Sequence, residues 1–156
     1  MSNFSIDQLT AFIVRAKAAT YVGGGTHSPS CRPHSHDLQF RDGDFDYLDS
    51  YFGGADFIGE EVVYFLEQPV WAMNYYGRIL QPSLITAAEA GQIIQVSLSQ
   101  LYRQGRFLGG FEYTVSNSRY VDTSAGDTDH FTGTEWIIRD AVKVYELVYH
   151  GGVICD

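Results

Sequence analysis

The chain contains an internal repeat, and this feature limits its folds more than any other. One set of spaced residues comprises Phe57, Gly59, Glu61, Val70, Trp71, Met73, Tyr75, Tyr76, Gly77 and Ile79. The same spacing returns 74 residues later, without a gap, as Phe131, Gly133, Glu135, Val144, Tyr145, Leu147, Tyr149, His150, Gly151 and Val153. Upstream, Tyr47 and Asp49 match Tyr120 and Asp122 at an offset of 73 residues. A long period that occurs twice predicts two similar halves, over about 6–80 and 83–154, rather than a solenoid.

The length and composition are those of one globular domain. The chain has 156 residues, of which 45% are hydrophobic, so it can bury a substantial core and is too apolar to be disordered. Eleven Tyr, ten Phe and sixteen Gly favour a sheet over a helical bundle. We therefore expect residues 1–156 to form a single domain.

The net charge, the two cysteines and the lack of long apolar stretches limit the partners and the location that we expect. Nineteen acidic and ten basic residues give a net charge of −9, which argues against direct nucleic acid binding and favours cationic or neutral partners. Cys31 and Cys155 do not make a disulfide framework, and no apolar stretch approaches the length of a membrane span. No secretory signal is visible at the amino end, so we expect a cytoplasmic protein without a membrane partner.

Helical periodicity occurs once in each half. Ser5 and Gln8 have the form of a capping box, and the apolar residues that follow predict a helix over about 6–19. Pro82-Ser83 stands at the start of a second helical pattern, which runs to about Gln104. Gly91 weakens this second helix by roughly 1 kcal/mol relative to Ala.

Alternating apolar and polar residues follow each predicted helix. They predict strands over about 37–40, 44–52, 61–66, 70–76, 110–115, 118–123, 134–139 and 142–149. Asp42-Gly43 and Glu67-Gln68-Pro69 are turn signals, and short turns require antiparallel neighbours. The predicted fold class is α+β, a duplicated helix-plus-antiparallel-meander with two pseudo-symmetric halves. The pattern leaves open whether the two sheets merge or pack face to face.

The repeated acidic positions are candidates for function. Glu61 and Glu135 each follow a glycine by two residues at the start of an apolar strand, where a buried carboxylate needs a partner. Facing one cleft, they would supply two acids for general acid/base catalysis. The alternatives are a solvent-facing strand end or a structural bond to a Tyr hydroxyl or backbone amide. Repeated residues more often serve the shared fold, so the structural interpretation is favoured, and it extends to Asp49 and Asp122.

The segment 21–36 has no counterpart in the second half. It contains His27, His34, His36 and Cys31 among Gly, Ser and Pro residues. No His-x-x-x-His or Cys-x-x-Cys pattern accompanies them, and no phosphate-binding or dinucleotide motif occurs in the chain, so we expect no metal site and no cofactor. A long loop in a compact domain is often functional, which predicts a lid or rim for one site.

Several motifs resemble one family over nearly the whole chain. They are Arg32-Pro-x-Ser-His36-Asp37, Asp49-Ser-Tyr-Phe-Gly-Gly54, Phe57-x-Gly59-x-Glu61, Pro69-Val-Trp-Ala-Met-Asn-Tyr-Tyr-Gly77 and Tyr149-His-Gly-Gly152. They are similar to a prokaryotic family filed as domain of unknown function 5680, which has no established activity to carry over. Some members follow a helix-turn-helix segment, and this implies a sensory or ligand-binding module. No such segment precedes the capping box here, so a regulatory role would need a separate DNA-binding partner.

Three functions from different classes remain open. The leading hypothesis is a sensor-type small-molecule binding module with an aromatic-lined pocket between the halves. Its candidate ligand-binding residues are Arg32, His36, Tyr51, Glu61, Asn74, Tyr75 and His150. The acidic charge and the aromatic side chains favour a cationic or aromatic ligand, whereas Arg32 would favour an anion.

The other two hypotheses need different features. A protein-interaction module would form a homodimer through an exposed strand edge or bind a separate regulator protein. An enzyme would use Glu61 or Glu135 with His36 or His150 for acid/base catalysis.

Overall fold

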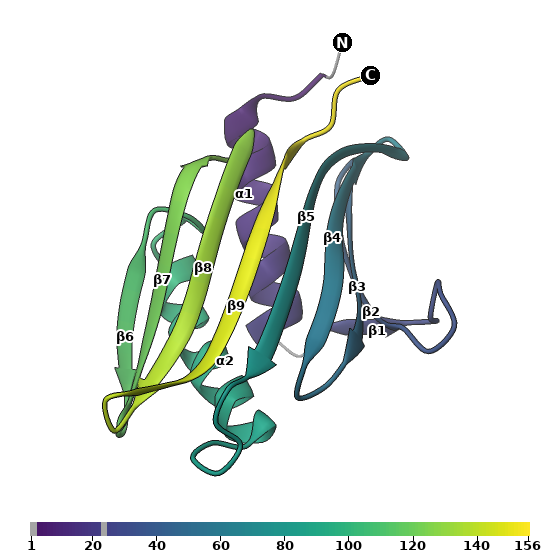
Figure 1. Cartoon of the computed structure of the whole chain (residues 1–156). Coiled ribbons are helices and arrows are strands. Elements are labelled where there is room, and N and C mark those ends of the chain that lie inside the picture. The colour runs from purple at the N-terminus through teal and green to yellow at the C-terminus, as the bar shows by residue number, and fades with distance from the viewer. Residues whose placement is uncertain (1–2, 23–24) are drawn as a thin grey trace.

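The computed structural model describes residues 3–22 and 25–156. Within them, nine strands form one antiparallel sheet in the order β1-β2-β3-β4-β5-β9-β8-β7-β6, and two helices lie on one of its faces (Figure 1). The elements are α1 (Ile6–Lys17), a π-helical turn (Ala18–Val22), β1 (Thr26–Ser28), β2 (His36–Asp42), β3 (Phe45–Gly53), β4 (Phe57–Phe65), β5 (Gln68–Ile79), α2 (Ala87–Tyr102), β6 (Phe111–Val115), β7 (Ser118–Asp127), β8 (His130–Arg139) and β9 (Val142–Val153). Gly23 and Gly24 of the predicted loop lie outside the described residues.

The predicted fold class is wrong. Strands make up 51% of the described residues and helices 21%, so the protein is a largely β fold rather than an α+β duplicated helix-plus-meander. The helix expected over about 83–104 is longer than α2, and most of the expected strands are too short. In particular, β5 and β9 continue through Gly77 and Gly151, which look like strand ends in the sequence, because backbone pairing to the neighbouring strand continues there.

The central pair of strands settles how the sheet is assembled. Trp71–Ile79 of β5 pairs antiparallel with Tyr145–Val153 of β9, and this pairing joins the strands before α2 to those after it. The question left open by the sequence is thereby answered, since the strands merge into one sheet. The start of α1 and the end of β9 lie at the same end of the molecule (Figure 1).

Each helix begins at a reciprocal capping box. Ser5 and Gln8 cap α1 as predicted. Thr86 and Glu89 form the same arrangement at α2, so this helix starts at Ala87 rather than at Pro82-Ser83. The Thr-x-x-Glu spacing is the stronger start signal because it satisfies two backbone N–H groups at once.

The first hairpin turn was predicted correctly, but the second begins one residue earlier than expected and is shorter. β2 ends at Asp42 and β3 begins at Phe45, so the predicted Asp42-Gly43 signal marks the turn. β5 already includes Gln68 and Pro69. The turn before it is made by Leu66 and Glu67, which both have positive φ, of 48° and 66°.

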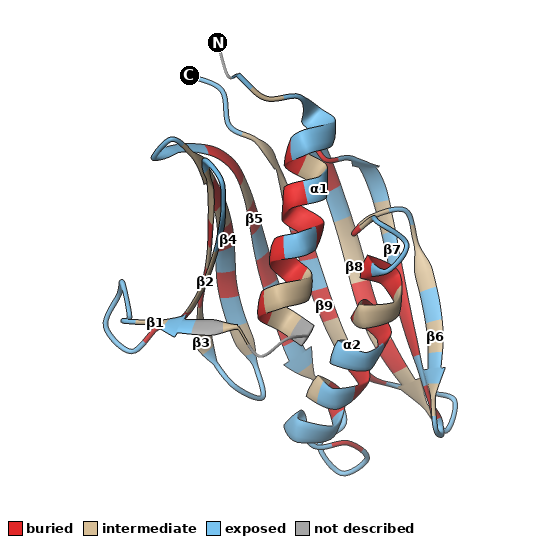
Figure 2. Cartoon of the chain, turned by 180° about the vertical axis from the view of Figure 1, so that it is seen from behind, coloured by how far each residue is buried: buried red, intermediate tan, exposed pale blue. Residues whose placement is uncertain are grey.

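The two faces of the sheet differ in what covers them. α1 and α2 pack on one face, and the buried side chains are concentrated between them and the sheet (Figure 2). Leu9, Phe12 and Ile13 of α1 are fully buried there. The other face has no helix over it among the described residues. In the part of the chain that the structure covers, neither helix is long and apolar enough to cross a membrane.

Candidate functional site

Four buried carboxyl groups face the helices from the sheet. Asp49 is paired in register with Glu61, and Asp122 with Glu135. Their residues are 1%, 1%, 4% and 6% exposed, respectively. Like charges placed directly opposite on neighbouring strands destabilise a sheet, and a buried carboxylate needs hydrogen bonds or a cation. Each pair must therefore be stabilised by the residues around it.

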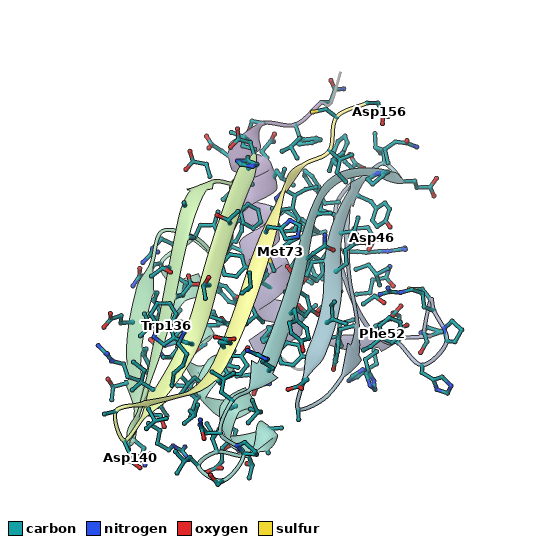
Figure 3. All side chains as sticks on the ribbon, viewed as in Figure 1. Asp46, Phe52, Met73, Trp136, Asp140 and Asp156 are labelled. Carbon is teal, nitrogen blue, oxygen red and sulfur yellow. The ribbon has the colours of Figure 1, made fainter. Side chains whose placement is uncertain are left out.

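The first pair is stabilised by a lysine. Lys17 of α1 is buried, and its Nζ lies 2.5 Å from Glu61 Oε2. The same Nζ lies 3.9 Å from the sulfur of Met73, near the middle of the sheet (Figure 3). Asp49 accepts a hydrogen bond of 2.6 Å from the Tyr75 hydroxyl. Burial and the neighbouring Glu61 raise the pKa of Asp49 to about 7.

The second pair is stabilised by phenols. Asp122 accepts a hydrogen bond of 2.8 Å from Tyr149, and Glu135 accepts bonds from Tyr120 and, at 2.9 Å, from Tyr145. Among the described residues, no Lys or Arg forms an ion pair with either acid. Burial raises the pKa of Asp122 to about 6 and that of Glu135 to about 7, so both acids hold protons at a higher pH than they would in water.

The glycines of the Gly-x-Glu motifs allow the tyrosine–aspartate bonds to form. The ring of Tyr75 passes over Gly59 of the intervening strand, where an added Cβ would lie 2.4 Å from the Tyr75 hydroxyl oxygen. Gly133 has the same relation to Tyr149, with an added Cβ 2.0 Å from the ring. The absence of a side chain therefore lets each hydroxyl reach across one strand to Asp49 or Asp122.

A cavity of about 330 Å³ lies beside the first carboxyl pair, and we call it the outer cavity. Five aromatic side chains form much of its wall: Tyr21, Tyr51, Phe57, Tyr75 and Tyr145. Asp49 is the acidic residue in this wall. Such a volume lies at the lower end of the range for small-molecule sites.

Exposed residues of three segments surround the mouth of the outer cavity. They are His27 of β1, residues 53–55 at and just after the end of β3, and Ala87 and Gln95 of α2. Gly91 of α2 also lines the cavity, and a Cβ added there would meet nothing within 4 Å. The glycine that weakens α2 thus leaves space at this site.

A smaller space of about 60 Å³, the inner cavity, lies between α1, α2 and the middle of the sheet. Tyr21 and Tyr75 belong to the walls of both cavities. Lys17, Glu61, Asp122 and Glu135 all line the inner one. Three carboxyl groups, one from the strands before α2 and two from the strands after it, therefore face one interior space.

The structure brings together three of the seven predicted ligand-binding residues. Tyr51 and Tyr75 line the outer cavity, and Glu61 lies next to it in the wall of the inner cavity. The His36 ring is exposed, with its centroid 5.0 Å from that of Tyr51.

The other three predicted residues lie elsewhere. Asn74 and His150 are exposed and paired with each other in register, on the face of the sheet opposite the helices. Arg32 donates to the backbone oxygen and the hydroxyl of Ser50, at 3.1 and 2.9 Å, and covers the ring of Phe52 beside the loop between β1 and β2 (Figure 3). These side chains do not share a concavity with Tyr75.

Residues of the loop 29–35 form a separate polar cluster with Asp37 of β2 and Ser50 of β3. Asp37 accepts hydrogen bonds from the Cys31 amide and from the hydroxyls of Ser35 and Ser50. Burial opposes ionisation of Asp37, but these bonds outweigh it and hold its pKa at about 2. The cluster fixes the loop to the sheet. Among the described residues, no group of three or more His, Cys, Asp or Glu side chains is arranged to hold a metal ion.

Sequence reasoning missed Lys17 and the contribution of the helices to the site. Lys17 follows Ile13 by four residues, and this spacing places it on the same face of α1 as the buried Leu9, Phe12 and Ile13. A lysine on an apolar helix face indicates a buried acidic partner, so the signal was present. Thr20 and Tyr21, from the turn after α1, could not be placed because the sequence does not reveal the π-helical turn.

Comparison with known proteins identifies a family. The model of the family described as "Domain of unknown function (DUF5680)" matches residues 49–154. The chain belongs to this family. The matched segment includes Asp49, Tyr75 and both carboxyl pairs, but neither α1 nor the loop before β2. Neither a curated protein nor a solved structure matches the DUF5680 chain.

The arrangement of this DUF5680 chain separates two kinds of chemistry. Acid/base catalysis by Glu61 or Glu135 with a histidine would need His36 or His150 at the inner cavity, and among the described residues no histidine lines it. The outer cavity has a different character, because it combines an opening, aromatic surfaces and one carboxyl group. It is the place where a ligand could enter and be held.

Proposed function

We propose that this protein is a small-molecule binding module and that the outer cavity is its binding site. The observation that carries the proposal is one cavity of about 330 Å³ that combines five aromatic side chains with Asp49, which is 1% exposed. Sites for small molecules are concave and mostly apolar, with a few polar groups that fix the orientation of the ligand. No catalytic step is part of this proposal.

Gly91 supplies the variant that tests the site. We expect Gly91→Phe to fill the mouth of the cavity, because nothing stands within 4 Å of an added Cβ. The matched control is Gly91→Ala, which adds a single methyl group at the same position. Neither change alters a charge or a hydrogen-bonding side chain.

The measurement is a thermal-shift screen of the purified protein against metabolites, amines, carboxylic acids and nucleotides. A ligand present at a hundred times its dissociation constant adds about 2.7 kcal/mol to the free energy of unfolding. We expect hits that Gly91→Ala retains and Gly91→Phe loses. Hits that survive in Gly91→Phe would place binding elsewhere, and silence across the panel would refute the proposal.

A protein-interaction role is favoured by a different observation. Ile58, Tyr76 and Val148 stand side by side in register on the uncovered face of the sheet, and they are 55%, 47% and 56% exposed. Exposed apolar residues that adjoin one another mark interaction surfaces. If this face joins two copies of the chain, light scattering at increasing concentration will report a dimer and Tyr76→Glu will abolish it. A monomer at all concentrations would remove this alternative.

A further inference from the structure

The charges in the wall of the outer cavity are of one sign. Among the described residues that form it, Asp49 is the one acidic side chain, and neither Lys nor Arg is present. Lys17, the nearby buried cation, is already paired with Glu61 at 2.5 Å. An anionic ligand would therefore enter a cavity that offers it a carboxyl group and no cation.

One oxygen of Asp49 is left for a ligand. Within the described residues, the single hydrogen-bond donor to this carboxyl is the Tyr75 hydroxyl, and it bonds to Oδ1. Tyr75 is itself fixed over Gly59, so the carboxyl group is held in one orientation. Oδ2 has no donor there, although an ionised carboxylate accepts several hydrogen bonds.

The aromatic side chains complement this acid. The Phe57 ring lies 6.0 Å from that of Tyr75 and 6.4 Å from that of Tyr145, between centroids, and all three line the cavity. The faces of aromatic rings attract cations, most strongly where water is excluded. A carboxylate among aromatic rings is thus suited to an ammonium group that carries an apolar body.

We propose that the ligand of the outer cavity is an organic monocation, an ammonium group on an aromatic or alkyl body, and that Asp49 is its counter-ion. This inference rests on the proposed function and names the class of molecule that the same site takes. The ammonium group donates to Asp49 Oδ2, and the apolar body lies against Phe57, Tyr51 and Tyr145. The net charge of −9 attracts such a ligand to the protein.

Binding of a cation must be linked to the ionisation of Asp49. The titratable groups around this carboxyl come from five strands, α1 and the turn after it: Lys17, Tyr21, His27, Asp37, Tyr47, Tyr51, Glu61 and Tyr75. The part of α2 that lines the cavity contributes none. Burial raises the pKa of each of the four tyrosines, so all stay neutral near pH 7. The pKa of Asp49 is about 7, and the ammonium group pairs with the ionised form. As the pH is raised towards 7, the affinity for an amine should increase about tenfold per pH unit, and above 7 it should become constant.

The test compares three molecules of one shape and different charge. Isothermal titration calorimetry at pH 8 would use 2-phenylethylamine, 2-phenylethanol and phenylacetate as cation, neutral molecule and anion. We expect the amine to bind about tenfold or more tightly than the alcohol. We expect no binding of phenylacetate. Gly91→Phe should abolish binding of the amine.

Asp49→Asn is the decisive variant, because it removes the charge and keeps the shape. It should weaken amine binding by about tenfold or more, leave the alcohol unchanged and remove the pH dependence. Asp122→Asn is the matched control, since Asp122 also accepts a hydrogen bond from a tyrosine but does not line the outer cavity. It should bind the amine as the unmodified protein does. A pH dependence that persists in Asp49→Asn would implicate His27 instead and overturn the assignment of Asp49.

The outcomes separate this inference from the proposed function. If the alcohol or phenylacetate binds as tightly as the amine and Gly91→Phe abolishes that binding, the cavity is a binding site and the cationic class is wrong. If none of the three molecules binds at millimolar concentration, the cationic class is refuted for this shape, and silence in the wider screen refutes the binding site as well. Normal unfolding curves for Asp49→Asn exclude misfolding as the cause of a loss.

Discussion

The two carboxyl pairs occupy corresponding positions on the sheet but are stabilised in different ways. Asp49 and Glu61 have one tyrosine and a buried lysine, whereas Asp122 and Glu135 have three tyrosines and no cation among the described residues. The first pair keeps a charge in the interior and adjoins the larger cavity. The second is satisfied by hydrogen bonds from tyrosine hydroxyls. The comparison shows that one arrangement of strands can hold a pair of buried acids either with or without a buried cation.

The largest expected effect comes from removing the lysine of the first pair. Lys17→Met leaves Glu61 buried beside Asp49 without its cation, and we expect the free energy of unfolding to fall by about 3–5 kcal/mol. Urea denaturation at pH 8 measures it, and the double variant Lys17→Met/Glu61→Leu should recover most of the loss. Arg15→Met is the control, because its ion pair with Asp42 is exposed and contributes at most about 1 kcal/mol. Equal stability of the two single variants would show that the first pair needs no cation.

Removing the charge of Asp122 in the second pair should raise the free energy of unfolding instead of lowering it. The pKa of Asp122 in the folded protein is about 6, above its unfolded value of 3.8, so this group favours folding at low pH and the benefit is lost as pH rises through 6. Asp122→Asn cannot ionise, so the variant does not lose this stability when the pH rises. We expect it to stabilise the protein at pH 8 by at most about 3 kcal/mol, and to have little effect at pH 4. Denaturant midpoints at both pH values measure the difference, and a variant less stable than the unmodified protein at pH 8 would mean that the charged form is needed.

A smaller effect on stability is expected from replacing a glycine that lies beneath a tyrosine ring, as Gly59 and Gly133 both do. In Gly133→Ala the added methyl group would lie 2.0 Å from the ring of Tyr149, so the ring must move and its bond to Asp122 is lost. We expect a loss of about 1–3 kcal/mol. Thr132→Ala, the exposed neighbour on the other face of β8, should change stability much less. If both variants unfold at the same denaturant concentration, the ring is not held as described.

The smallest effect on stability is expected from a substitution in the wall of the outer cavity, which adjoins the first pair. Gly91→Ala should raise the free energy of unfolding by up to about 1 kcal/mol, because alanine favours the helix and its methyl group meets no neighbour. Thermal unfolding measures the gain. A loss of stability would mean that the helix packs more closely on the sheet than the cavity implies.

The sequence allowed the individual helices, strands and turns to be predicted better than the way in which they are assembled. The capping box at Ser5, the Asp42-Gly43 turn and the approximate position of every strand except β1 were predicted from local chemistry, which acts within a few residues. β1 lies in the segment that was predicted to be a loop. The balance of strand and helix was misjudged because pairing between β5 and β9 depends on residues far apart in the chain. The Thr86 and Glu89 capping box could have been read and was missed.

The candidate site was half predictable for a similar reason. Tyr51, Tyr75 and Glu61 face the helices, and all three were selected from the sequence. Asn74 was selected with its neighbour Tyr75, although adjacent residues of a strand point to opposite faces and cannot share a pocket. The place of Lys17 on the buried face of α1 could have been read from its spacing, but its partner Glu61 could not. That pairing and the aromatic wall at Tyr21 depend on which helix face meets which strand, and no local pattern gives that.

The position of β9 has a consequence for how the chain folds. β9 follows all the other strands in the chain, and it alone connects β5 to β8. Until it is in place, the strands before α2 have a long unpaired edge along β5, and those after α2 have one along β8. Closing this seam joins residues more than sixty positions apart, which makes folding slow and exposes an edge that other chains can pair with. Loss of this one strand would therefore divide the sheet into two unfinished pieces rather than shorten it.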